Sequence, residues 1–179
     1  MSLFLITLLN GVALAVRGAC FLWSPAKFVE AIQAFPRSKR ATYLLMGLGS
    51  AWFLYHVTQL GEADYGNFKS YLFAGFLAVA LLSFYWVPDF LAVRGLCILL
   101  LLLAKVHLDA AFMQWDLPQR LVFVAYTYVL IFLALYLAVS PFRVRQFLRW
   151  AYRRIPRARA FGAALGGAGI VLLALAWSY

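Results

Sequence analysis

Two kinds of helix adjoin in residues 121–157, LVFVAYTYVLIFLALYLAVS followed by PFRVRQFLRWAYRRIPR. The first part is apolar and matches the length of about 20 residues that a helix needs to cross a bilayer core. After Ser140-Pro141, a helix-starting pair, the second part has apolar residues at helical spacing. On another face it has an arginine at every fourth position: Arg145, Arg149 and Arg153. The pattern predicts a membrane-spanning helix that continues into an amphipathic helix lying in the membrane interface.

Apolar stretches of similar length recur along the whole chain. Hydrophobic residues make up 66% of the sequence and charged residues 12%, whereas soluble domains have about half and about a quarter. Six spans are expected: Ser2–Trp23, Tyr43–Leu60, Ser70–Val87, Asp89–Ala110, Leu121–Ser140 and Ala160–Ser178. The predicted fold class is therefore an all-α, polytopic membrane helical bundle. It forms a single integral membrane domain over residues 1–179, with amphipathic interfacial segments at about 24–36 and 141–157.

Charge in the connections predicts the orientation. Three connections carry nearly all of the basic residues: Lys27, Arg37, Lys39 and Arg40; Arg94; and the arginines between residues 143 and 159. The other two carry the acidic residues Glu62, Asp64, Asp109 and Asp116. Since basic loops stay on the cytoplasmic side, both termini are expected outside. The lack of long hydrophilic loops favours a bacterial inner membrane.

The net charge of +10 calls for an anionic partner. The arginines around the second amphipathic segment are predicted to contact the head groups of anionic lipids: Arg143, Arg145, Arg149, Arg153, Arg154 and Arg157. No groove-reading motif accompanies them, so nucleic acid is not an expected partner.

Ionisable residues within the spans mark the candidate site, because such groups usually face a bundle interior or a cavity. They collect near the predicted outer face: His56 in the second span, and Lys105, His107 and Asp109 in the fourth. One interpretation is structural, with a Lys105–Asp109 pair and two histidines that hydrogen-bond neighbouring helices. A second is a solute or proton path lined by all four residues.

The third interpretation is haem b. His56 and His107 are the only histidines, and they lie in different helices at the same predicted depth, as two axial imidazoles would. Apart from this possibility no cofactor is expected, and no residue cluster predicts a metal site.

An internal similarity joins residues 14–20, LAVRGAC, to residues 91–97, LAVRGLC. Three helices followed by three helices would suit an inverted repeat of the transporter kind. The simpler hypothesis is that Arg17 and Arg94 each extend to the cytoplasmic interface. The sequence leaves both open.

Small residues in the last span predict close helix packing. Gly162 and Gly166 have Gly-x-x-x-Gly spacing, and Gly167 follows Ala163 at the same spacing on an adjacent row. Such a face lets helix backbones approach closely, within the bundle, in self-association or against other membrane subunits.

No motif of a hydrolase, metalloprotease or phosphate-binding loop is present. The sequence therefore predicts a non-catalytic accessory or scaffold subunit of a membrane complex. A small transporter or proton-coupled channel is the alternative, and a haem-binding electron-transfer membrane anchor the second alternative.

Overall fold

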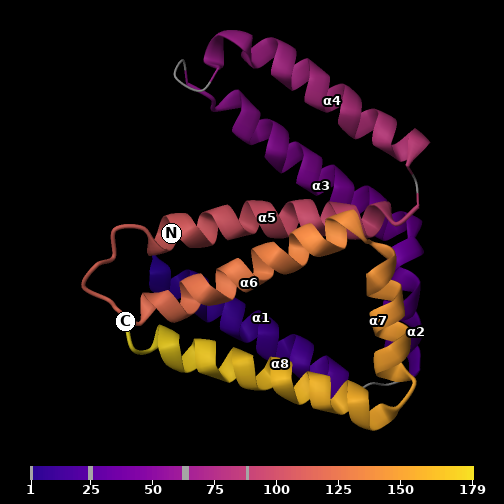
Figure 1. The fold of residues 1–179 in the computed structure, drawn as a ribbon, viewed down its shortest axis with the longest axis vertical. Coiled ribbons are helices and arrows are strands. Elements are labelled where there is room, and N and C mark those ends of the chain that lie inside the picture. The colour runs from indigo at the N-terminus through magenta and orange to yellow at the C-terminus, as the bar shows by residue number, and fades with distance from the viewer. Residues whose placement is uncertain (1, 24–25, 62–64, 88) are drawn as a thin grey trace.

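The computed structural model describes residues 2–23, 26–61, 65–87 and 89–179, which form a bundle of helices (Figure 1). No strand occurs among these residues, which confirms the all-helical fold class. The helices are α1 (Leu3–Trp23), α2 (Ala26–Ala34), α3 (Lys39–Thr58), α4 (Lys69–Trp86), α5 (Leu91–Ala111), α6 (Arg120–Val139), α7 (Phe142–Tyr152) and α8 (Ile155–Ala176), with short 3-10 turns η1 (Phe35–Arg37) and η3 (Gly66–Phe68).

Five helical segments are long and apolar enough to cross a membrane: α1, η3 with α4, α5, α6 and α8. The predicted span Tyr43–Leu60 corresponds to α3, which has 20 residues. Helix α3 does not qualify because its sequence, with several polar and aromatic residues, is less apolar than those of the others. Among the described residues, five of the six expected spans therefore qualify by length and composition, and the sixth stays a prediction.

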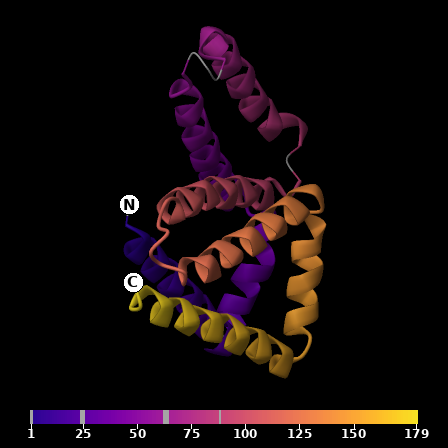
Figure 2. The same ribbon diagram turned by 60° about the vertical axis from the view of Figure 1, so that its left-hand side comes forward.

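The helices α1, α5, α6 and α8 run between two ends of the molecule (Figure 1). At one end α2 and α7 lie across them and contact each other. Both chain termini lie at the opposite end (Figures 1 and 2). The α3–α4 hairpin leans away from α6 and α8, and α5 is the helix on which α3 packs. The short helices thus form a surface layer, and the long helices form the body of the bundle.

Glycines set the contact between α1 and α8, the closest helix pair of the fold. A Cβ atom at Gly18 would lie 2.6 Å from the backbone nitrogen of Gly166 and 2.7 Å from the carbonyl oxygen of Gly162. A Cβ atom at Gly169 would lie 2.6 Å from the backbone nitrogen of Ala15. No side chain fits at these points, so the two backbones approach as they do in small-residue interfaces of membrane helices.

This contact uses part of the packing face predicted for the last span. Gly162 is buried against α1, and the backbone of Gly166 lies against Gly18. Gly167, in contrast, is exposed, and a Cβ atom there would have nothing within 4 Å. One residue further along a helix is rotated by about 100°, which takes Gly167 off the face. Of the three glycines, Gly162 is the one whose Cβ direction is covered by α1; a Cβ atom at Gly166, like one at Gly167, would have nothing within 4 Å, so part of the predicted face stays open.

The similar segments LAVRGAC and LAVRGLC both supply a contact glycine. Gly95 allows α3 to approach α5, since a Cβ there would lie 2.6 Å from the backbone nitrogen of Met46. However, residues 14–20 lie near the end of α1, whereas residues 91–97 begin α5. The shared segment therefore lies toward the C-terminal end of α1 but at the N-terminal end of α5.

A proline corrects the second amphipathic segment. The expected helix over 141–157 ends at Tyr152, and α8 begins at Ile155 with Pro156 in its first turn. Arg154 between them is extended, with φ −137° and ψ 119°. Proline suits the first turn of a helix but not its interior, so the chain starts a new helix there. The first amphipathic segment corresponds to α2 and η1, and Ser24 and Pro25 lie outside the described residues.

Candidate functional site

A polar cluster lies where α1, α5 and α6 meet. The His107 side chain of α5 is fully buried. Its Nε2 atom lies 2.9 Å from Nδ2 of Asn10 in α1. Tyr126 of α6 donates its hydroxyl to Oδ1 of Asn10 at 3.4 Å. Three long helices are thus joined through one asparagine side chain.

The hydrogen bonds of Asn10 favour one tautomer of His107. Asn10 Nδ2 donates to the carbonyl oxygen of Ile6 at 2.9 Å, so the end of the amide that faces His107 carries the hydrogens. Nε2 of His107 must therefore accept, and the imidazole proton resides on Nδ1. Nδ1 is buried and has no hydrogen-bond partner among the described residues. In this tautomer one buried donor has no partner among the described residues, which costs free energy in a dry interior.

The neighbours of this cluster are apolar side chains and hydroxyl groups that hydrogen-bond to their own helix backbone. The ring of Phe123, also fully buried, has its centroid 5.1 Å from that of His107. The buried hydroxyls of Thr7 and Thr127 donate to carbonyls of their own helices, at 2.8 and 2.9 Å. The surroundings therefore hold the His107 ring in place as part of the packed core.

The structure divides the three α5 members of the predicted outer polar set between two faces of that helix. Lys105 Nζ and Asp109 Oδ2 form an ion pair at 3.1 Å, with side chains 59% and 65% exposed. His107, two residues from each, points into the bundle. Residues two positions apart on a helix are about 200° apart, so the pair and the histidine point in opposite directions. The transport hypothesis that uses all four residues stays a prediction.

His56 occupies different surroundings from His107. Its ring lies beside Trp52 and Tyr55 of its own helix, with centroids 6.4 and 6.0 Å apart. Its Nε2 atom is buried and has no partner in the described part of the chain, whereas Nε2 of His107 is engaged by Asn10. Haem ligation by both rings would require that contact to break, and it also stays a prediction. Across the described ranges, no three His, Cys, Asp or Glu residues group as metal ligands.

The exposed ion pair predicts a small effect of mutation. Lys105→Met and Asp109→Asn are each expected to lower the free energy of unfolding by less than about 1 kcal/mol. Asp109 is close to the end of α5, and a lysine side chain can extend to the interface. Thermal unfolding of the purified variants in detergent measures this. If the free energy of unfolding of either variant were lower by several kcal/mol, the pair would not be a surface contact.

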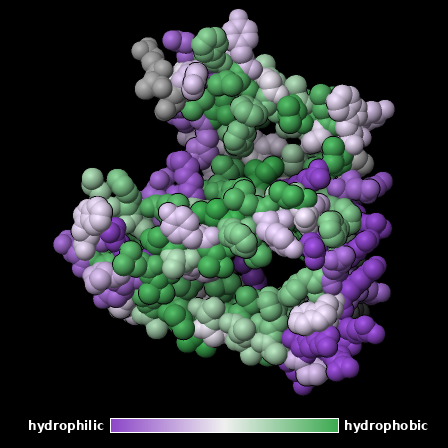
Figure 3. Space-filling view, in the orientation of Figure 1, coloured by the Kyte–Doolittle hydropathy of each residue, from purple (hydrophilic) through white to green (hydrophobic). Residues whose placement is uncertain are grey.

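The predicted lipid-contacting arginines lie at the α2–α7 end. Arg143 and Arg149 on α7 are exposed, as are Arg153 and Arg154 in the turn to α8, while Leu148 and Ala151 of α7 are buried. Three of the set lie over aromatic rings: Arg143 over Phe142, Arg145 over Phe90 and Arg157 over Trp150. Figure 3 shows hydrophilic side chains gathered along this edge of the molecule. The amphipathic division expected for this segment is therefore present in α7.

Asn10 and Tyr126 are members of the site that sequence reasoning missed. Asn10 is a polar residue in the middle of an apolar span, which is itself a signal of a helix–helix contact. Tyr126 gives no such signal, since tyrosine is common in membrane helices.

Comparison with known proteins gives no relative: no family model matches the chain, and no curated protein or solved structure does. The site must therefore be interpreted from its own geometry.

Proposed function

We propose that this chain is a non-catalytic accessory or scaffold subunit of a membrane complex, and that the α3–α4 hairpin receives an apolar transmembrane helix of a different protein. The observation that carries the proposal is the accessibility of α4 along its whole length. It has membrane-spanning length and composition, yet none of its residues is buried. The other four membrane-length helices all have buried residues.

Only one side of α4 packs against α3. Phe76 packs edge-on against Phe53 of α3 at 4.9 Å, and Phe84 stacks on Tyr43 at 5.6 Å. The opposite side presents small exposed residues in one region: Ala74, Gly75 and Ala78. A Cβ atom at Gly75 would have nothing within 4 Å. Small side chains let a second helix come close enough for backbone packing.

The hairpin also leaves an apolar hollow of about 210 Å³ between α3, α4 and α5. It is lined by Met46, Ser50, Phe53, Leu54, Phe76, Val79, Ala80 and Ile98. The hollow lies on the side of α4 that faces α3, so we place the partner helix on the opposite, small-residue side formed by Ala74, Gly75 and Ala78. A second copy of this chain and lipid alone are the competing outcomes of the test.

The proposal includes the orientation of the chain in the membrane. Helix α3 has 20 residues and leads away from the α2–α7 end (Figure 1), so we take it as a sixth crossing beside the five helices that are both long and apolar enough. With the arginine-rich end in the cytoplasm, both termini are outside. The membrane is a bacterial inner membrane, and the arginines at residues 143–157 contact anionic lipids.

Gly75→Leu is expected to abolish association with the partner and leave the chain folded, because the new side chain enters the open face of α4. The matched control is Gly167→Leu, the same change at an open position of α8. A photo-reactive residue at position 78 in each background, used in native membranes, measures contact directly. We expect a cross-link to a different protein that Gly75→Leu removes and Gly167→Leu keeps. Cross-links to this chain alone, or to lipid alone, would contradict the proposal.

A further inference from the structure

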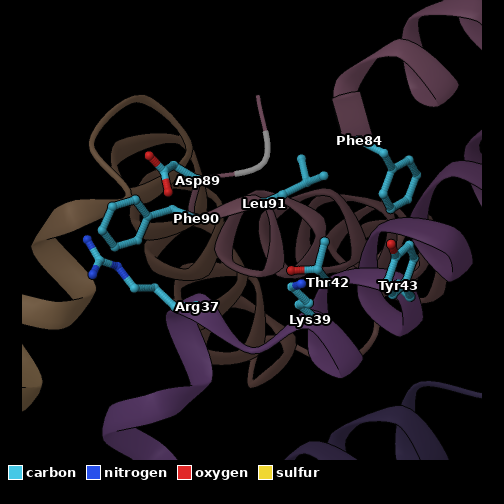
Figure 4. A pocket seen from close by; sticks show the side chains of 8 residues that line it. All are labelled: Arg37, Lys39, Thr42, Tyr43, Phe84, Asp89, Phe90 and Leu91. Carbon is cyan, nitrogen blue, oxygen red and sulfur yellow. The ribbon is translucent and has the colours of Figure 1, made fainter. Parts of the chain in front are cut away.

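A second hollow, of about 550 Å³, lies where α3 and α5 begin and α4 ends (Figure 4). Its volume is within the range of about 300–1,000 Å³ that ligand pockets have. We call it the basic hollow. Its lining residues are Arg37, Lys39, Thr42, Tyr43, Phe84, Asp89, Phe90 and Leu91.

The cations of the basic hollow have no counter-ion among the described residues. Within those ranges Lys105–Asp109 is the one ion pair, so neither Arg37 nor Lys39 has a described carboxylate within 4.0 Å. Asp89 lines the same hollow without pairing with them. Both cationic side chains are exposed and are free to turn toward a ligand.

A third cation, Arg145, lies beside Phe90, which lines the basic hollow. The guanidinium carbon of Arg37 is 5.5 Å from the centre of the Phe90 ring, and that of Arg145 is 5.4 Å from the same ring. Nε of Arg145 is buried and makes no hydrogen bond to any described residue. Like charges held near one aromatic ring repel each other, so a bound anion would stabilise this arrangement.

The backbone adds to the positive potential. Helix α3 begins at Lys39, and α5 begins at Leu91 without a side-chain cap. Both starts line the basic hollow. The positive ends of two helix dipoles therefore reinforce the charge of the side chains.

We propose that the basic hollow binds one phosphate group, that of a phospholipid head group, with Arg37 and Lys39 as its main ligands. Paired cations beside the positive ends of helix dipoles suit a phosphate group. The stacked rings of Tyr43 and Phe84 border the hollow. Exposed Tyr85 and Trp86 follow at the end of α4, as in an aromatic belt at head-group depth. A lipid seated here has its acyl chains beside α4. This is a single site, independent of the accessory role.

The test uses the full chain purified in detergent, and counts bound phosphatidylglycerol by native mass spectrometry. Arg37→Gln with Lys39→Gln is the test variant. Arg40→Gln with Arg159→Gln removes the same charge at exposed positions outside both the basic hollow and the predicted lipid-contacting set, and is the control. We expect one tightly bound lipid in the wild-type and control proteins. In the test variant we expect the lipid affinity to fall by about tenfold or more. Equal loss in both variants, or in neither, would overturn the site.

Two further measurements sharpen the result. Inorganic phosphate is added in place of lipid, and its effect on thermal unfolding is recorded. Protection by lipid that phosphate does not reproduce supports the head group, whereas equal protection by phosphate overturns the lipid source. Asp89→Asn removes a negative charge from the lining and should strengthen lipid binding by several-fold. Weaker binding in Asp89→Asn would contradict a phosphate ligand.

Discussion

Gly18→Leu is expected to destabilise the protein severely, by about 3 kcal/mol or more. A Cβ atom at this position would lie within 2.8 Å of three backbone atoms of α8. Backbone atoms cannot turn away as the end of a flexible side chain can. The two helices must therefore separate, and the contact that joins the two ends of the chain is lost.

Unfolding of the variant in mixed micelles, with detergent composition as the denaturant, measures the loss. Gly167→Leu provides the control, because it is the same change in a membrane-length helix at a position with nothing within 4 Å. It should alter the free energy of unfolding by less than about 1 kcal/mol. If the two variants unfold alike, the backbones of α1 and α8 are not in close contact.

His107→Ala is expected to cost about 3 kcal/mol. The change empties a fully buried site next to Phe123 and leaves the Asn10 amide without a partner on α5. His56→Ala is the control: that ring is half-buried and contacts residues of its own helix. It should cost about 1 kcal/mol.

A double-mutant cycle separates the hydrogen bond from simple loss of volume. Asn10→Ala combined with His107→Ala should be less harmful than the sum of the single changes, with a coupling of about 1 kcal/mol. The same unfolding measurement is used for all four proteins. Strict additivity would mean that Asn10 and His107 do not depend on each other.

Much of the fold could be predicted, because long apolar stretches allow little besides membrane-length helices. The errors have local causes. Ser38 caps α3 by accepting a hydrogen bond from Ala41 N at 3.3 Å, so the helix includes basic residues that hydropathy alone assigns to a loop. Pro156 starts α8 earlier than its apolar residues do.

The candidate site was harder to predict. That Lys105 and Asp109 share a face, and that His107 opposes them, follows from helix geometry alone. The partners of His107 do not. Asn10 is 97 residues away in sequence, and Tyr126 is 116 residues from Asn10. Such contacts depend on which helices become neighbours, and helix periodicity carries no information on that.

The central claim, that the chain is an accessory subunit, is tested most directly by purification from its native membrane in mild detergent. The absorbance spectrum and the subunit composition should be recorded on the same sample. We predict a colourless protein with one different membrane protein in fixed stoichiometry. A Soret band that His56→Ala and His107→Ala remove would contradict the claim in favour of haem, and a colourless protein without partners would contradict it in favour of transport.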